Sequence, residues 1–467
     1  MLQRKRILLG TVMSRPGLKL TRTHIFPVTR SSLGQPQSVW MLLGIGLLLL
    51  GAGCGQRTER DATAADGSTT ITVWAHHGKP EEWKTIQSQV ERFNASQTNI
   101  IARLVEIAEA NYDTQVQSAA ASGQLPDVLE FDGPMLANYA WKGYLKPLEG
   151  LTAEIRADLL PSILQQGTYE GKLYAVGTFD SGLGLFANRR SLEIVNARIP
   201  TTVTNAWTLD EFNQLLARLA EQEKQSGGDG QVLDLKRDYR GEWWTYGFYA
   251  CLVSAGADLI ARPDYQSAAG VLNSPQAIAT LSQIQHWFRA GYVDPNTDGR
   301  AFVDGRTAIS WVGHWEYPRY RESLGTQLVL LPLPDFGQGS RTGMGSWAWG
   351  VTRECRQLEA ALKFIEFLLQ PKEIEAIVAA NGAVPSRRSV IADSELYRSG
   401  GPLHLYAEQL SQSAVPRPVT PAYPVITSAF QEVMAGVIEG GDVKSALDAA
   451  VKTIDRDIRD NGGYATK

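Results

Sequence analysis

Apolar residues recur at two different spacings between residues 70 and 131, and this change of spacing predicts strands that alternate with helices. Runs of β-branched apolar residues predict strands, whereas Trp83, Ile86, Val90 and Phe93 share one face at helical spacing. The predicted strands are 70–74, 100–107 and 125–131, and the predicted helices are 80–94 and 111–122. Because this order is β-α-β-α-β, it predicts a parallel sheet with right-handed crossovers, and therefore an α/β fold.

Helical spacing returns later in the chain. Thr208 and Glu211 form a capping box before an apolar helical face. Further helices are predicted over 358–369, around 430–438 and over 443–454. Four tryptophans fall in predicted helices or at their starts, and we interpret them as structural: Trp83, Trp141, Trp207 and Trp287.

Aromatic and polar side chains follow the carboxyl ends of two predicted strands. Trp74, His76 and His77 end the first strand, and Phe131 and Asp132 end the third. Ligands of open parallel sheets bind beyond the carboxyl ends of the strands. We therefore expect these five residues at a binding site.

The amino-terminal segment predicts export. Residues 39–53 are an apolar run that follows basic residues, ends in small residues and is too short for a standard membrane-spanning helix of roughly 20 residues. Cys54 comes next and resembles the cysteine of the bacterial lipoprotein lipobox, although Gly51 stands where that family prefers leucine. The resemblance implies a signal peptide over 1–53, acylation of Cys54 and a flexible tether over 54–69. An ordinary cleaved signal with an incidental cysteine is the alternative.

Charge is distributed unevenly along the 467 residues. The formal net charge is −4, but residues 1–53 hold seven Lys/Arg and no acid, which leaves 38 basic against 49 acidic side chains, or −11, on the remainder. An acidic body is a poor nucleic-acid binder, so we expect no nucleic-acid partner. The 43% hydrophobic and 20% charged residues exclude a disordered chain and a multi-span membrane protein.

Cys251 and Cys355 are compatible with one disulfide or with two buried thiols.

Seven short segments, in order, resemble those of the extracellular solute-binding proteins of ABC importers, in the family of maltose-binding protein. The resemblance covers roughly residues 70–460, with Gly177 replacing a usual proline and Ala187 a usual aromatic residue. The segments are Ile71–Trp74, Ala121–Val128 (ASGQLPDV), Gly171–Gly177 (GKLYAVG), Leu185–Arg189 (LFANR), Phe302–Ile309 (FVDGRTAI), Gly313–Trp315 (GHW) and Ala360–Leu368 (AALKFIEFL).

The resemblance implies a two-lobed, type II periplasmic-binding-protein fold with a multi-strand hinge and a cleft between the lobes. The N-terminal lobe would combine 70–178 with 325–384, and the C-terminal lobe 183–320 with 388–467. The hinge would lie near 177–182, 345–350 and 383–386. The implied function is to capture a solute in the cleft and deliver it to the transmembrane subunits of an ABC permease, as a lipid-anchored monomer without a cofactor.

The aromatic residues indicate a carbohydrate ligand, either a mono- or oligosaccharide or a glycoside. Sugar C–H faces stack on aromatic rings, and sugar hydroxyls need hydrogen-bonding groups beside those rings. By the resemblance, Trp315 matches a position whose indole commonly stacks on sugar, and Tyr246 is similar to another pocket aromatic. The candidate ligand-binding residues are Trp74, His76, His77, Phe131, Asp132, Asp180, Trp244, Tyr246, Trp311, His314, Trp315, Glu316 and Trp347.

Catalysis, sensing and metal binding are alternatives to simple transport. A glycosidase needs two carboxylates that flank the scissile bond, and Asp132, Asp180 and Glu316 could serve if they converge. The chain lacks GxSxG, HExxH, P-loop and GxGxxG signatures, so binding without catalysis is favoured. A protein that presents its ligand to a sensor is a third class.

Adjacent residues at a strand end point apart, so His76 and His77 would rarely chelate one metal ion, and we expect no metal site.

The lipobox resemblance predicts that Cys54→Ser releases the protein from membranes, because the variant has no thiol to acylate. Fractionation of cells into membrane and soluble pools measures this. Persistent membrane association of the variant would instead show that residues 39–53 act as an uncleaved anchor.

Overall fold

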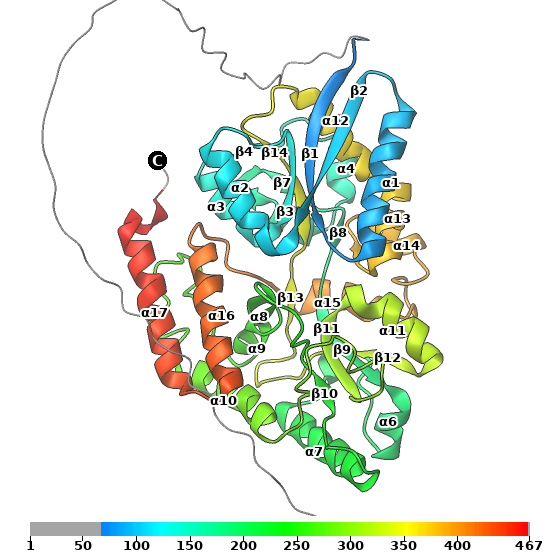
Figure 1. The fold of residues 1–467 in the computed structure, drawn as a ribbon, viewed down its shortest axis with the longest axis vertical. Helices are drawn as coiled ribbons and strands as arrows, with labels where there is room; N and C mark the ends of the chain where they lie inside the picture. The colour runs from blue at the N-terminus through cyan, green and yellow to red at the C-terminus, as the bar shows by residue number, and fades with distance from the viewer. Residues whose placement is uncertain (1–66, 466–467) are drawn as a thin grey trace, which may run out of the picture. The chain divides into compact units, whose positions relative to one another are not determined.

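The computed structural model describes residues 67–465, and the predicted Cys54 and signal segment lie outside them. The first sheet has the strand order β2-β1-β3-β14-β4, with β7 also paired to β14 (Figure 1). β1 pairs in parallel with β2 and β3, which confirms the parallel sheet predicted for this segment. The strands are β1 (Thr69–His77), β2 (Ile100–Ala108), β3 (Val128–Asp132), β4 (Leu145–Lys146), β7 (Ala175–Val176) and β14 (Trp347–Thr352).

Helices cover this sheet through the apolar faces that the spacing predicts. In α1, Trp83, Ile86, Val90 and Phe93 are all buried, and they belong to the same core as β1. We call the first sheet with its helices the N-terminal lobe. The helices are α1 (Pro80–Ser96), α2 (Tyr112–Ala121), α3 (Leu136–Trp141), α4 (Ala153–Asp158), α5 (Pro161–Gln166), α12 (Leu358–Leu368) and α13 (Pro371–Asn381), beside the β5 (Thr168–Tyr169)–β6 (Lys172–Leu173) hairpin.

A second sheet, ordered β10-β11-β9-β12, forms the centre of what we call the C-terminal lobe. Its strands are β9 (Leu183–Asn188), β10 (Leu233–Asp234), β11 (Ile309–Gly313) and β12 (Leu328–Leu331). Because β12 pairs with β9, residues 328–331 belong to this sheet, and the predicted start of the second N-terminal-lobe segment at residue 325 is wrong. A further parallel pair, β13 (Thr342–Met344) with β16 (Ala414–Pro416), packs beside β9.

Helices surround the second sheet and its neighbours (Figure 1). Thr208 and Glu211 form the reciprocal capping box that their spacing predicts, and α7 begins directly after Thr208. α16 packs along α17 and also touches α8 and α10. The helices are α6 (Arg189–Ile194), α7 (Leu209–Gln225), α8 (Trp243–Tyr246), α9 (Tyr249–Ser254), α10 (Pro275–Arg289), α11 (Tyr317–Leu324), α15 (His404–Gln412), α16 (Tyr423–Glu439) and α17 (Val443–Asp460).

The chain passes between the two lobes at three places. β8 (Phe179–Asp180) pairs with β15 (Val384–Pro385) just before α14 (Arg388–Asp393), and the third passage runs between β13 and β14. Asp180 connects these segments, because its carboxylate accepts hydrogen bonds from the N–H groups of Ser181 (2.8 Å) and Gly345 (3.3 Å).

Two further observations concern thiols and membranes. Cys251 and Cys355 are free and buried, and burial raises the pKa of the Cys355 thiol to about 12. Across residues 67–465, no helix combines the length and apolarity required to cross a bilayer.

Candidate functional site

Two edges of the lobes meet, and each carries side chains predicted for the site. On the N-terminal lobe, β3 ends at Asp132, and antiparallel β14 begins opposite it at Trp347. On the C-terminal lobe, β11 ends at Gly313, and residues 314–316 form a 3-10 turn directly after it. Side-chain bonds link the two edges, so the candidate site lies between the lobes.

A buried ion cluster around Arg417 joins the edges at one end. The Arg417 guanidinium donates two hydrogen bonds of 2.8 Å to the carboxylate of Asp132 and one of 2.8 Å to Glu242. Its centre lies 4.7 Å from the centroid of the Tyr246 ring, in a cation–π contact. Tyr423 and Thr427 donate hydroxyl hydrogen bonds to Glu242 and hold it beside the cation.

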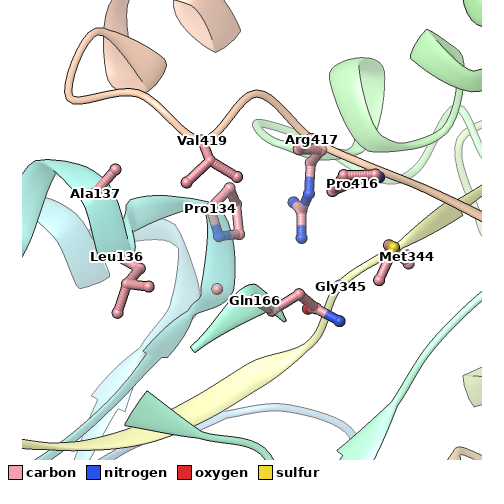
Figure 2. A pocket seen from close by; sticks show the side chains of 10 residues that line it. Pro134, Leu136, Ala137, Gln166, Met344, Gly345, Pro416, Arg417 and Val419 are labelled. Carbon is pink, nitrogen blue, oxygen red and sulfur yellow. The ribbon is translucent and has the colours of Figure 1, made fainter. Parts of the chain in front are cut away.

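The hollow beside Arg417 is small. Figure 2 shows the Arg417 side chain extending from the segment after β16 into the space lined by Pro134, Gln166, Gly345 and Val419. The cavity volume is about 20 Å³, which is room for roughly one water molecule. The lobes are therefore in contact at this point, and this hollow is too small for a sugar as it stands.

A second bridge joins the edges through Lys79, which lies between β1 and α1. Its ammonium donates to the Glu316 carboxylate at 2.9 Å, and the Tyr239 hydroxyl donates to the same oxygen at 2.7 Å. The Trp315 indole N–H donates to the Tyr239 hydroxyl at 2.8 Å. Burial acts to raise the pKa of the Glu316 carboxyl, but Lys79, Lys236 and the Tyr239 hydrogen bond leave it lowered. Glu316 therefore remains ionised and fixes the orientation of Trp315 through Tyr239.

On the N-terminal edge, His76 supports Trp347. The two rings stack with centroids 3.6 Å apart and planes 3° from parallel, and Tyr112 meets the indole edge-on. His76 Nδ1 lies 2.8 Å from a Glu130 carboxylate oxygen. Burial alone lowers the pKa of His76, but the Glu130 carboxylate, with Glu82 nearby, raises it to about 9. His76 is thus a buried imidazolium beneath a partly exposed indole.

Four of the predicted tryptophans keep an exposed part: Trp74, Trp244, Trp315 and Trp347. Trp244 stacks on Phe248, with ring centroids 5.7 Å apart. Tyr246 is buried, and its hydroxyl lies 2.8 Å from that of Ser181 at the hinge. Tyr246 therefore connects Arg417 to the hinge.

Three predicted site residues lie in the interior instead. Phe131 and Trp311 are 0% exposed and belong to the hydrophobic cores, and the Trp311 indole donates to the Gly247 carbonyl at 3.0 Å. His314 is buried, with Nδ1 2.8 Å from the Asn381 carbonyl, and burial lowers its pKa to about 4. Strand alternation and turn geometry direct these side chains inward in this arrangement of the lobes, and their role as ligand contacts stays a prediction.

Two other predicted residues have structural partners. Asp180 is 0% exposed, and its carboxylate is occupied by hinge N–H groups and the Gln166 amide at 3.1 Å. His77 is exposed and lies 2.5 Å from a Glu106 carboxylate oxygen on the neighbouring strand. These contacts explain both residues without a ligand.

The carboxylates considered for hydrolysis have different partners. Asp132 is held by Arg417, Glu316 by Lys79 and Asp180 by backbone N–H groups at the hinge. Within residues 67–465, no group of three or more His, Cys, Asp or Glu side chains is arranged to hold a metal ion.

Sequence reasoning missed several central residues, namely Lys79, Tyr239, Glu242 and Arg417. Arg417 stands in the proline-rich run AVPRPVTP, which has no periodicity, and its partner Asp132 is 285 residues away. Only the charge of Arg417 in an otherwise apolar run could have signalled a special role.

The fold is a two-lobed α/β fold, and the candidate site lies where the lobes meet. Residues 88–400, well over half of the chain, match the model of the bacterial extracellular solute-binding proteins. The chain belongs to this family, whose members bind solutes.

Relatives and solved structures of this kind span nearly the whole chain. A lipoprotein of Streptomyces antibioticus is 24% identical over 425 residues, covering 86% of this chain and 89% of its own length. A maltooligosaccharide ABC transporter solute-binding lipoprotein of Streptococcus pneumoniae is 20% identical over 431 residues, covering 89% and 95%.

Among solved structures, maltose-bound MalE3 of T. maritima has a TM-score of 0.72 at 21% identity, covering 83% of this chain and 100% of its own. The GacH receptor of Streptomyces glaucescens, solved unliganded and with acarbose, has a TM-score of 0.69 at 21% identity, covering 84% and 98%. These likenesses show the two-lobed type II fold.

The contrast between Trp311 and Trp315 gives a matched pair of variants. Trp311→Ala should lower the free energy of unfolding by roughly 3–5 kcal/mol, because it removes a fully buried indole. Trp315→Ala should cost less stability but weaken solute binding by roughly 1–3 kcal/mol. Urea denaturation and titration calorimetry measure the two effects. Unchanged affinity in Trp315→Ala would remove Trp315 from the site.

His76 predicts a pH-dependent stability. Its pKa rises from about 6.5 in the unfolded chain to about 9 in the fold, so its contribution is fully present below pH 6.5 and is lost as the pH rises through 9. The stability difference between wild type and His76→Gln should therefore shrink by about 3 kcal/mol across this interval. Urea denaturation at several pH values tests this, with exposed His77→Gln as the control. A pH-independent difference would show that His76 is neutral in the fold.

Proposed function

We propose that this protein captures a carbohydrate between its lobes and delivers it to the membrane subunits of an ABC importer. The observation that carries the proposal is the pair of partly exposed indoles on facing edges: Trp347, which stacks on the buried His76 ring, and Trp315, whose N–H donates to the Tyr239 hydroxyl. Rigid aromatic faces beside hydrogen-bonding groups suit the C–H faces and hydroxyls of a sugar.

Buried polar atoms near Arg417 support the same ligand class. Within the described part of the chain, Asn138 Oδ1, Ser346 Oγ and Arg417 Nε are buried and have no hydrogen-bond partner. Such atoms are costly to leave unpaired. Hydroxyl groups of a ligand, which both donate and accept hydrogen bonds, would satisfy all three once the lobes admit it.

The names of the similar proteins point the same way. The pneumococcal relative is a maltooligosaccharide-binding lipoprotein of an ABC transporter, and the solved neighbours hold maltose or acarbose. We extend from these names a sugar ligand, a permease partner and a lipid anchor at Cys54, which holds the monomeric body at the outer face of a membrane.

The proposal predicts that a mono- or oligosaccharide raises the melting temperature of the purified protein. Binding to the folded state alone stabilises it by about 2.7 kcal/mol at a ligand concentration 100 times Kd. A thermal-shift screen compares sugars with amino acids and polyamines. If only the amino acids or polyamines shift the melting temperature, the carbohydrate proposal is wrong.

A control separates binding from hydrolysis. Each oligosaccharide that shifts the melting temperature is incubated with the protein and assayed for new reducing ends. A binding protein leaves their number unchanged, whereas an increase that Asp132→Asn abolishes would identify a hydrolase.

A further inference from the structure

The contacts of Arg417 divide unequally between the two lobes. Arg417 follows β16, which pairs with β13 beside β9, so it belongs to the C-terminal lobe. Glu242, which precedes α8, belongs to that lobe too, and α8 packs on α16. Asp132 alone comes from the N-terminal lobe. When the lobes separate, Arg417 keeps Glu242 and loses Asp132.

The bond between Arg417 and Asp132 is built for strength. It is bidentate, with both nitrogen–oxygen distances at 2.8 Å, and Arg417 is 5% exposed. Backbone at the hinge makes room for it: Gly345 has φ +130°, and a Cβ there would lie 2.7 Å from Arg417 Nη2. The glycine at position 345 therefore leaves the space that the Arg417 guanidinium occupies when the lobes are closed.

The ion pair between Lys79 and Glu316 is weaker because its lysine is exposed to water. The Lys79 side chain is 42% exposed and makes a single contact with Glu316, so water and salt screen it. The burial of Arg417 and its two hydrogen bonds to one carboxylate make it the stronger of these two ion-pair bridges. Buried hydrogen bonds act beside it, among them the one that the Asn138 amide donates to the Pro421 carbonyl at 2.7 Å.

We propose that Arg417 is a positioning residue for solute binding: by pairing with Asp132 it stabilises the closed arrangement of the lobes and sets how often the site opens. An interaction present in one arrangement and absent in the other shifts the balance by its own free energy. The part of this inference that concerns solute rests on the proposed function, but the closing of the lobes does not.

The lobe separation is measured in the full chain without any solute. Gln87→Cys on α1 and Ala217→Cys on α7 place one exposed thiol on each lobe, in a Cys54→Ser background. Cys251 and Cys355 are 2% and 1% exposed and do not take up label. Spin labels on the two introduced thiols then report the distribution of distances between the lobes.

Wild type should show mainly the short distance. Arg417→Met and Asp132→Asn should each raise the long-distance fraction roughly tenfold or more, because each leaves a charge without its partner. The double variant should open no further than either single variant, because both remove the same bond. Arg417→Lys keeps the charge but not the bidentate geometry and should lie between.

Glu373→Gln is the matched control, because it breaks the Arg92–Glu373 ion pair within the N-terminal lobe and should leave the distances unchanged. The inference is overturned if wild type is mainly open, if the Arg417 and Asp132 variants keep the wild-type distribution, or if Glu373→Gln opens the lobes equally.

The rate of solute binding tests whether the Arg417–Asp132 bond affects solute capture. For any sugar found in the thermal-shift screen, stopped-flow binding to Arg417→Met should show a faster association rate, because more molecules are open when solute arrives. An unchanged rate would overturn the role in solute entry. If no sugar binds at all, the carbohydrate proposal fails. The distance measurement still decides whether the Arg417–Asp132 bond holds the lobes together.

Discussion

A buried charge must meet an opposite charge, and this constraint organises the contact between the two lobes. Arg417 is almost completely buried and is neutralised by Asp132 from one lobe and Glu242 from the other. Removing a single partner from such a cluster is costly, because the remaining ion stays out of water. Other groups support the same cation. The ring of Tyr246 contacts the Arg417 guanidinium, and the hydroxyls of Tyr423 and Thr427 bind its partner Glu242.

Local spacing predicted much of the N-terminal lobe. The positions of β1, α1, β2, α2 and β3 follow from whether apolar residues recur every second position or every third to fourth. The same reasoning found α7 through its capping box. It could not place β14 between β3 and β4, or β12 beside β9, because those pairings join segments more than 130 residues apart and depend on the whole fold.

The candidate site was predictable only in part, for a related physical reason. A strand end indicated Asp132, residue type indicated Trp347, and the family resemblance indicated Trp315; all three lie at the facing edges. The same rules could not separate Trp311 from Trp315, although the first is sealed in the core and the second is partly exposed. That difference depends on where β11 ends and the chain turns. The role of Arg417 required knowing which distant residues the closed lobes bring together.

The strand order of the first sheet also bears on how the chain acquires its fold. β14 lies between β3 and β4, yet it is more than 200 residues later in the sequence than either. A chain that emerges from its amino end therefore presents β3 with an unpaired edge until residues 347–352 arrive, and unpaired edges invite association with other chains. Completion of the first lobe must wait for the strand that returns from the second, so the two lobes depend on one another during folding as well as in the finished molecule.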